Sequence, residues 1–404
     1  MGHEGEQQQP GEPPHRRGAS RIVGWTIVAL AFLLVAVALT GYAAYRDLFD
    51  KIHRLHVTDL GRRPPKFNNS LNILVIGSDS REGKNARFGA HISGQRSDTI
   101  MVLHLSPGLK HAIVLSIPRD SVVPVLNCPP APGAPGQLAQ PGQVEQINAT
   151  FALGGPGCLW KTVEQTTHLR LDHFMELNFT GFEHVINDLG GVDICLPYPI
   201  KDPRSNLRLR AGLHHVWGAE ALAYWRVRYI GMGSDLERIQ RDQYLMASLA
   251  QKIKRTNLFG DPARLIKIVS DVASSLTTDS GLSQGMLLSL AESLRSMTLS
   301  DVHFIQVPVL AYQKNENWVV WAPSARPLFS AIAHDRKLPK QRGHHSADRE
   351  SHRAATPEAP DATHPGSSES PPAFRHLTKT YGGINGRAGV CRDQGAFTGP
   401  LGGH

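Results

Sequence analysis

The stretch IVGWTIVALAFLLVAVALTGYAAY, residues 22–45, contains no charged residue and constrains the fold of this 404-residue chain more than any other feature. As a helix it would extend roughly 36 Å, against a hydrocarbon core of about 30 Å. We therefore expect one transmembrane helix over residues 22–45. The alternative is a cleaved signal peptide. It is disfavoured because the stretch is longer than a usual signal core and no A-x-A cleavage site follows it.

Basic residues flank the apolar stretch on both sides, so the positive-inside rule favours neither orientation. Cysteine usage indicates instead on which side of the membrane the bulk of the chain lies. Cys128 and Cys158 bracket a Pro/Gly-rich segment that would be loose unless its ends were tied. A disulfide there would stabilise the fold by about 3–4 kcal/mol and requires an oxidising compartment. Cys195 and Cys391 are candidates for a second pair, although four cysteines allow three pairings. We expect a single-pass protein of the cell membrane whose large domain is extracytoplasmic.

Changes of composition divide the chain into five parts. Residues 1–20 are polar and rich in Gly, Pro and Gln, which predicts a disordered cytoplasmic leader. After the anchor at 22–45 come a charged connector at 46–70 and an ordered domain at 71–335. The rest, 336–404, is dominated by His, Pro, Ser, Gly and charged residues and predicts a mostly disordered tail.

Within the ordered domain, apolar runs alternate with segments of helical spacing. Runs at 71–77, 99–105 and 111–117 predict buried strands, and the SPGLK segment between the last two predicts a hairpin. Helical spacing appears at 146–153, 159–169, 218–228, 235–255, 262–276 and 283–297. Hairpin-linked strands mixed with helices predict an α/β fold, a three-layer α/β/α sandwich with a central mixed sheet, preceded by the transmembrane helix.

Charged residues stand at the ends of the predicted strands. The first strand is followed by Asp79 and Arg81, and the second is preceded by Arg96 and Asp98. If these strands are antiparallel, Asp79 and Asp98 face one another at the edge where open α/β sheets bind ligands. Two close carboxylates with room for water favour Mg²⁺, which makes both candidate metal ligands. Ordinary turn carboxylates are the alternative.

The third strand ends in SIPRDS, and an antiparallel return would bring its arginine to the same edge. Arg119 would then join Arg96 there, whereas a solvated surface arginine is the alternative for either residue alone. A later cluster, AYWRVRYIGMGSDLERIQRDQ, concentrates further arginines within a short segment. Several guanidinium groups together suit a diphosphate because each binds phosphate oxygens bidentately. The cluster comprises Arg226, Arg228, Arg238 and Arg241. Acidic residues that partly alternate with it leave an ordinary charged helix as the alternative.

The formal net charge of +8 favours an anionic partner. An extracytoplasmic domain rarely meets DNA, so we expect no nucleic-acid partner and favour a phosphate-bearing substrate or lipid headgroups.

Seven ordered blocks between residues 71 and 276 resemble the LytR-CpsA-Psr family of cell-wall glycopolymer ligases, of actinobacterial type. They are NILVIGSDSR, RSDTIMVLHL, LSIPRDS, INATFALGGPG, GFEHVINDLGGVDICLP, ALAYWRVR and SDLERIQRDQ. The resemblance implies an extracytoplasmic phosphotransferase that attaches polyprenyl-pyrophosphate-linked glycopolymers, such as teichoic acid, to a peptidoglycan acceptor with the help of Mg²⁺.

The resemblance also implies roles for individual residues. Arg96, Arg119 and Asp98 are the expected catalytic residues, and Asp79 and Asp98 the expected metal ligands. The expected phosphate-binding residues are Arg81, Arg226, Arg228, Arg238, Arg241 and Gln243. One departure matters: Asp242 stands where the family commonly has Gln, and an acid there would weaken the grip of Arg238 or Arg241 on phosphate.

Two other functions remain open at this level. A polyprenyl-pyrophosphate pyrophosphatase would use the same residues with water as the acceptor. A membrane-anchored transcriptional attenuator or regulator would need a DNA-binding helix in the cytoplasm, which the leader of twenty residues does not provide.

Overall fold

The computed structural model falls into two compact units, Met1–Lys51 and Ile52–His404. The described residues are 33–36, 39–43, 46–58, 60–78, 97–131, 134, 136, 140–196, 199–203, 205–227, 235–256, 260–339 and 384–385.

The described part of the first unit is helical, at residues 33–36, 39–43 and 46–50. Its apolar side chains are largely exposed, with Leu34 and Leu39 at 62%. Among the described residues, no helix combines the length and the apolar character that a membrane span needs. The greater part of the predicted anchor at 22–45 lies outside the described residues.

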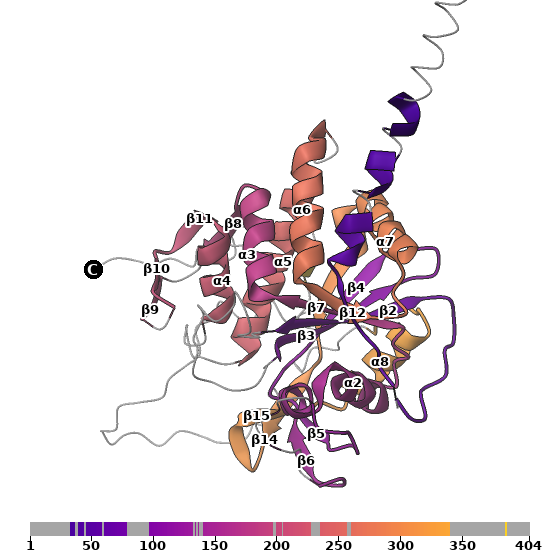
Figure 1. The fold of residues 1–404 in the computed structure, drawn as a ribbon. Helices are drawn as coiled ribbons and strands as arrows, with labels where there is room; N and C mark the ends of the chain where they lie inside the picture. The colour runs from indigo at the N-terminus through magenta and orange to yellow at the C-terminus, as the bar shows by residue number, and fades with distance from the viewer. Residues whose placement is uncertain are drawn as a thin grey trace, which may run out of the picture. The chain divides into compact units, whose positions relative to one another are not determined.

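The second unit is organised around a sheet whose strands follow the order β1-β12-β7-β2-β3-β4-β13-β16 (Figure 1). β3 is antiparallel to both of its neighbours, whereas β2 and β7 are parallel, as are β4 and β13. The predicted α/β fold with a central mixed sheet is therefore confirmed. The strands are β1 (His53–Leu55), β2 (Leu71–Ser78), β3 (Ser97–Leu105), β4 (Ala112–Ile117), β7 (His173–Asn178), β12 (Leu276–Asp279), β13 (Val302–Gln306) and β16 (Ile384–Asn385).

The alternation of side chains along β2 and β3 builds a core on each face of this sheet. On one face, Leu74 and Ile100 pack with α2 (Ile147–Thr167) and α8 (Ala325–Ala333). On the other, Ile73 packs with α7 (Gln284–Ser296). Helices therefore cover both faces of the sheet.

A further apolar cluster joins several helices with a short ladder of two strands. These elements are α3 (Phe179–Asp188), α4 (Gly218–Arg226), α5 (Asp235–Arg255) and the strands β8 (Val192–Leu196) and β11 (Gly212–Val216). α6 (Pro262–Ser275) packs on α3. The remaining pairs are β5 (Val122–Pro124) with β6 (Val144–Gln146), β9 (Ile200–Asp202) with β10 (Leu207–Leu209), and β14 (Val309–Tyr312) with β15 (Asn315–Trp321).

The sheet draws strands from segments that the sequence assigned to the connector and the tail. β1 belongs to the predicted connector at 46–70 and pairs with β12. β16 belongs to the predicted tail at 336–404 and pairs with β13. The ordered fold thus begins before residue 71 and takes up part of the tail.

A disulfide joins Cys128 to Cys158, with 5.6 Å between the Cα atoms, as the Pro/Gly-rich segment between them led us to expect. Cys195 is also disulfide-bonded, whereas its candidate partner Cys391 lies outside the described residues. Cys158 belongs to the second half of α2, which is interrupted at Gly155 (φ 73°) ahead of Pro156. The two predicted helices at 146–153 and 159–169 are the two halves of this element.

A buried ion pair ties the connector to α2. The carboxylate of Glu164, fully buried, accepts hydrogen bonds from Arg63 Nε at 2.9 Å and Nη2 at 2.6 Å, and from the backbone N–H of Leu171 at 2.8 Å. The guanidinium of Arg63 also lies 5.3 Å from the ring centroid of Trp160.

Removing Arg63 should therefore leave a buried carboxylate without its counter-charge. We expect Arg63→Ala to lower the free energy of unfolding by about 3 kcal/mol. Arg62→Ala, one residue away and exposed, should change it by less than about 0.5 kcal/mol. Urea unfolding followed by circular dichroism measures both, and equal effects would contradict this account of the pair.

The buried imidazole of His104 makes the fold sensitive to acid. Burial lowers the pKa of His104 below its usual 6.5, although Asp335 opposes the shift. Its Nδ1 lies 2.7 Å from Asn72 Oδ1. Because the unfolded chain takes up a proton at the usual pKa and the folded chain does not, stability should be full above pH 6.5 and fall as the pH drops below it.

We therefore expect the melting temperature to fall between about pH 7.5 and about pH 5.5, and to fall less in His104→Asn. The exposed His168 provides the control, since His168→Asn should keep the wild-type pH dependence. A His104→Asn protein with that same dependence would contradict the assignment.

Candidate functional site

The ends of four strands meet along one edge of the sheet. Gly77 pairs with Thr99 and Ser78 with Ser97, so the end of β2 lies beside the start of β3. Ser78 also pairs with Asn178, the last residue of β7. On the other side of β3, Ile100 pairs with Ile117, the last residue of β4. We call this edge the rim. Both antiparallel pairings on which the sequence argument depended are confirmed.

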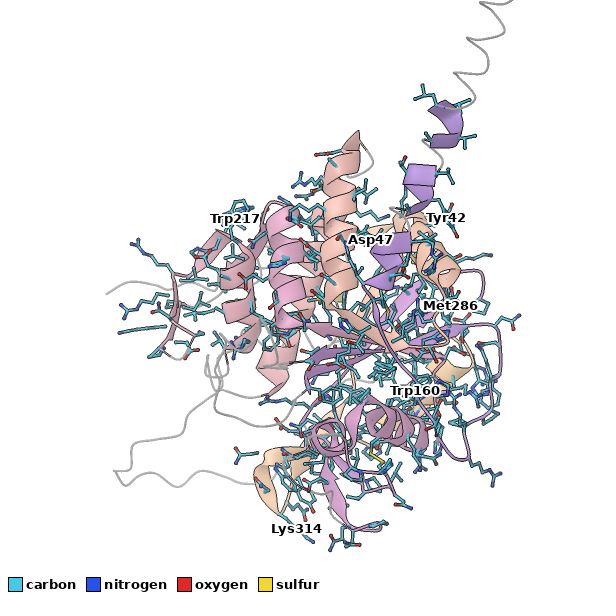
Figure 2. All side chains as sticks on the ribbon, in the orientation of Figure 1. Tyr42, Asp47, Trp160, Trp217, Met286 and Lys314 are labelled. Carbon is cyan, nitrogen blue, oxygen red and sulfur yellow. A yellow bond between two sulfur atoms is a disulfide. The ribbon has the colours of Figure 1, made fainter. Side chains whose placement is uncertain are left out.

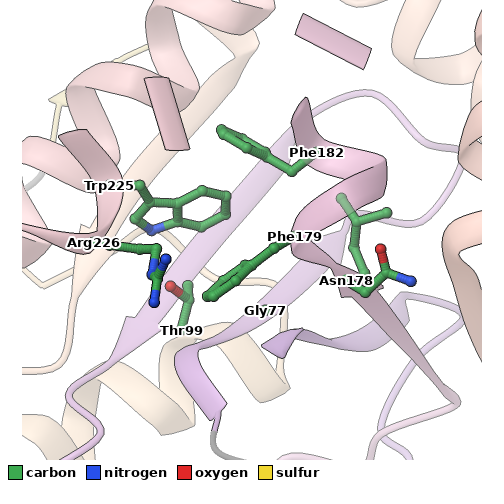
Figure 3. Close-up of a pocket in the computed structure, with 8 residues that line it drawn as sticks. Gly77, Thr99, Asn178, Phe179, Phe182, Trp225 and Arg226 are labelled. Carbon is green, nitrogen blue, oxygen red and sulfur yellow. The ribbon is translucent and has the colours of Figure 1, made fainter. Parts of the chain in front are cut away.

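A small, mostly apolar pocket opens at the rim (Figure 3). Phe182 and Trp225 form one side, with ring centroids 4.3 Å apart. The guanidinium carbon of Arg226 lies 5.1 Å from the ring centroid of Phe179, which places a cation against the aromatic wall. Its lining residues are Gly77, Thr99, Leu177, Asn178, Phe179, Phe182, Trp225 and Arg226. The pocket thus sets aromatic faces beside a cation, which suits contact with an apolar group that carries an anion at one end.

Local packing explains why α3 and α4 supply the aromatic wall. Asn178 caps α3, since its Oδ1 accepts a hydrogen bond from Gly181 N at 3.0 Å, and this starts the helix directly at the rim. At the start of α4, a Cβ on Gly218 would lie 2.2 Å from the backbone oxygen of Glu183 in α3. Only glycine lets the two helices approach this closely, and the approach brings Phe182 and Trp225 together.

Arg119 lies in a turn that is held from two sides. Its backbone oxygen accepts a hydrogen bond from Asn148 N in the first turn of α2 at 3.2 Å. The backbone oxygen of Asp120 accepts one from Val319 N in β15 at 3.1 Å. The carboxylate of Asp120 lies 3.4 Å from Arg119 Nε and accepts a hydrogen bond from Gln146 Nε2 at 2.9 Å. The turn thus holds the backbone of Arg119 against the first turn of α2, and the Arg119 side chain is 15% exposed.

The turn and the pocket belong to the same rim. Thr99 lines the pocket and precedes Ile100, whose partner Ile117 stands two residues before Arg119. The strand start that carries Asp98 therefore lies between the pocket and the turn.

The other half of the basic cluster packs between α4 and α5. Arg241 Nη2 donates a hydrogen bond to the backbone oxygen of Val227 at 2.8 Å, and its guanidinium carbon lies 5.9 Å from the ring centroid of Tyr224. Burial raises the pKa of Tyr224, and the charge of Arg241 opposes that shift. Arg241 thus holds the C-terminal end of α4, which carries Arg226. Gln243 is 2% exposed, and its amide has no hydrogen-bond partner among the described residues.

Several predicted site residues are not placed. Asp79, Arg81, Arg96 and Arg228 lie outside the described residues, and only the backbone of Asp98 and Arg238 is described, in β3 and α5. Within the described part of the chain, no group of three or more His, Cys, Asp or Glu side chains could hold a metal ion. The metal-binding and phosphate-binding roles therefore stay predictions.

The sequence did not single out the aromatic residues of the pocket as site residues. Phe179 ends the HFMELNF run, whose apolar content was the available signal, whereas Phe182 and Trp225 depend on the packing of α3 against α4. Trp160 is buried in the core on the other face, with its ring centroid 6.2 Å from that of Phe174.

Comparison with known proteins shows which family this chain belongs to. The model of the LytR_cpsA_psr family matches residues 40–333. The "Probable cell wall biosynthesis protein LcpB" of Corynebacterium glutamicum is 33% identical over 271 residues, 65% of this chain and 60% of that protein. The polyisoprenyl-teichoic acid–peptidoglycan teichoic acid transferase TagV of Bacillus subtilis is 28% identical over 282 residues, 65% of this chain and 64% of that protein. The chain thus spans less than two thirds of the length of either relative.

Among solved structures, the LytR-Csp2A-Psr enzyme from Actinomyces oris is similar, with a TM-score of 0.54 and 20% identity. The similarity covers 71% of this chain and 97% of that one, and it shows the same fold.

A side chain at position 77 should close the pocket. A Cβ there would lie 3.2 Å from Thr99 Cβ and 3.8 Å from Trp225 Cζ2. We expect Gly77→Val to weaken binding of anilinonaphthalene sulfonate, an aromatic anion that suits the lining, by at least about tenfold, or about 1.4 kcal/mol. Dye fluorescence measures the affinity. Gly285→Val, at a position with open space, is the control, and unchanged binding by folded Gly77→Val would refute the pocket.

Proposed function

Since this chain belongs to the LytR_cpsA_psr family, we propose that it is an extracytoplasmic phosphotransferase that attaches polyprenyl-pyrophosphate-linked glycopolymers to peptidoglycan. The observation that carries the proposal is the rim pocket, where an aromatic wall meets a guanidinium group. The name of the TagV relative describes a reaction of this type and supports the proposal.

The pocket matches the two chemical parts of such a carrier. Isoprenoid carbons would pack against the exposed edges of Phe179, Phe182 and Trp225, which line the pocket and are 5%, 3% and 9% exposed. The diphosphate would lie toward Arg226, since guanidinium groups bind phosphate oxygens bidentately. Gln243 is a further candidate to bind phosphate, because its buried amide has no hydrogen-bond partner among the described residues, and leaving such a group unpaired costs about 1–3 kcal/mol.

In the proposed reaction, a peptidoglycan hydroxyl oxygen bonds to the phosphorus next to the sugar. The bond from that phosphorus to the bridging oxygen breaks, and polyprenyl phosphate leaves with the electron pair. The hydroxyl proton passes to a base, for which a carboxylate oxygen of Asp79 or Asp98 that is not bound to the metal ion is the candidate. Negative charge shifts toward the leaving phosphate during transfer, so the guanidinium groups of Arg119 and, as proposed from the sequence, of Arg96 would lower the barrier.

We propose Mg²⁺ as the cofactor, with Asp79 and Asp98 as its ligands. Asp98 lies in β3 next to Ser97, and the partner of Ser97, Ser78, directly precedes Asp79 in the sequence. Two carboxylates with open positions for water fit the preference of Mg²⁺ for oxygen ligands. The bound ion would neutralise charge on the diphosphate.

Membrane anchoring through residues 22–45 is part of the proposal. Leu33, Leu34 and Val35 in the described helical part are 55–62% exposed, and lipid would cover such side chains at lower cost than water. The Cys128–Cys158 disulfide supports an oxidising location outside the cytoplasm.

Arg119 provides the direct test. We expect Arg119→Ala to slow transfer of a labelled glycan from its lipid carrier to peptidoglycan by about a hundredfold or more, because one fixed charge-stabilising group is lost. Arg119→Lys should recover only part of the rate, since an ammonium group lacks the bidentate geometry. Label in washed peptidoglycan is the readout.

Arg208→Ala, exposed on β10, is the matched control and should transfer at the wild-type rate. Wild-type transfer by Arg119→Ala would rule out the proposed site. Release of polyprenyl phosphate that proceeds equally without peptidoglycan would instead indicate hydrolysis of the carrier.

A further inference from the structure

The β14–β15 hairpin has an inner face that anchors it to the fold. Trp321 donates its indole N–H to Ser121 Oγ at 3.0 Å, and its ring packs edge-on against Phe329 of α8, with centroids 5.0 Å apart. Val309 packs on the same core. Because side chains alternate along a strand, the neighbours of these residues point to the other face.

The outer face of the hairpin carries apolar side chains, of which Leu310 is exposed while Tyr312, Trp318 and Val320 are half-buried. Leu310 is 55% exposed and pairs across the ladder with Val320. Tyr312 and Trp318 stack with ring centroids 5.9 Å apart and an interplanar angle of 14°. We call these four residues the aromatic platform.

The platform lies directly beside the Arg119 turn. Ser121 bridges to Val319 in a parallel pairing, and Val319 N donates to the backbone oxygen of Asp120. Trp318 precedes Val319 and so lies opposite Asp120, the residue next to Arg119. Figure 1 shows β14 and β15 next to β5, β6 and the start of α2.

The chemistry of the platform selects a neutral, hydroxyl-rich ligand. Stacked aromatic rings offer flat faces to the C–H faces of a pyranose ring, and nearby amides can pair with its hydroxyl groups. Amide residues at the tip are Gln313, Asn315 and Asn317. The opposite formal charges of Lys314 and Glu316 leave this segment without net charge, whereas the whole chain has a formal net charge of +8. Electrostatic attraction therefore does not favour binding of an anionic polymer at this surface.

We infer that the aromatic platform binds the sugar backbone of the acceptor glycan. The inference rests on the proposed transfer to peptidoglycan and adds where the acceptor lies. A saccharide on the platform would present its hydroxyl groups next to Arg119, and holding both reactants at one rim lowers the entropic part of the barrier.

Binding to purified peptidoglycan sacculi, stripped of attached polymers, tests the inference without the transfer reaction. The full chain in detergent micelles is cosedimented with sacculi. We expect Trp318→Ala and Tyr312→Leu each to weaken binding by about tenfold, while Trp318→Phe keeps most of it, because an aromatic face is what binds. Tyr312→Leu retains apolar packing, so it decides the matter if Trp318→Ala loses stability in a melting experiment.

Trp217 is the matched control, since it is 52% exposed and lies at α4, far from Lys314 at the hairpin tip (Figure 2). Trp217→Ala should bind like wild type. In the transfer assay, the platform variants should raise the acceptor KM with little change in kcat. Sacculus binding that is unchanged in folded Tyr312→Leu and Trp318→Ala overturns the inference. Platform-dependent binding without any transfer by wild type would instead support the glycan site and contradict the proposed function.

Discussion

The antiparallel pairing of β3 with both β2 and β4 is the constraint on which the rest of the site depends. β3 starts where its two neighbours end, so residues that follow one strand and precede the next come to a single rim. The parallel pairing of β7 with β2 adds Asn178 and the start of α3 to the same place. A slip of one residue in this register would turn every side chain of β3 to the opposite face, and the buried residues on both faces forbid it.

The two sides of the rim offer different chemistry. α3 and α4 close over one face of the sheet and form the aromatic pocket with Arg226. On the other face, α2, α8 and the β14–β15 hairpin support the Arg119 turn. The proposed lipid carrier and the proposed acceptor glycan would thus approach from opposite faces of the sheet and meet at its edge. This separation fits a transfer between a membrane-bound donor and a polymer outside the membrane.

Sequence patterns predicted the elements whose formation depends on burying a whole strand or one face of a helix. The apolar runs of β2, β3 and β4 predicted their positions, and the pairing of charged residues with strand ends predicted the rim. The Pro/Gly-rich segment between Cys128 and Cys158 predicted a disulfide that the structure contains.

The features that the sequence did not predict depend on contacts between segments that are far apart in the chain. β1 has three exposed residues and no apolar run, so only its pairing with β12 makes it a strand. Apolar spacing predicted the helix at 235–255 but does not decide which of its apolar residues are buried, since Ile253 of α5 is 43% exposed. The aromatic wall requires α3 and α4 to approach at Gly218, and no local pattern encodes that approach. Arg241 illustrates the same limit, since no local pattern predicted the hydrogen bond from its guanidinium to the backbone oxygen of Val227.

A crystal structure of the chain with a bound short-chain prenyl diphosphate would test the central claim most directly. The account predicts prenyl carbons against Phe179, Phe182 and Trp225, with the diphosphate between Arg226 and the Arg119 turn. A diphosphate bound on another face of the domain, with the rim pocket empty, would contradict it.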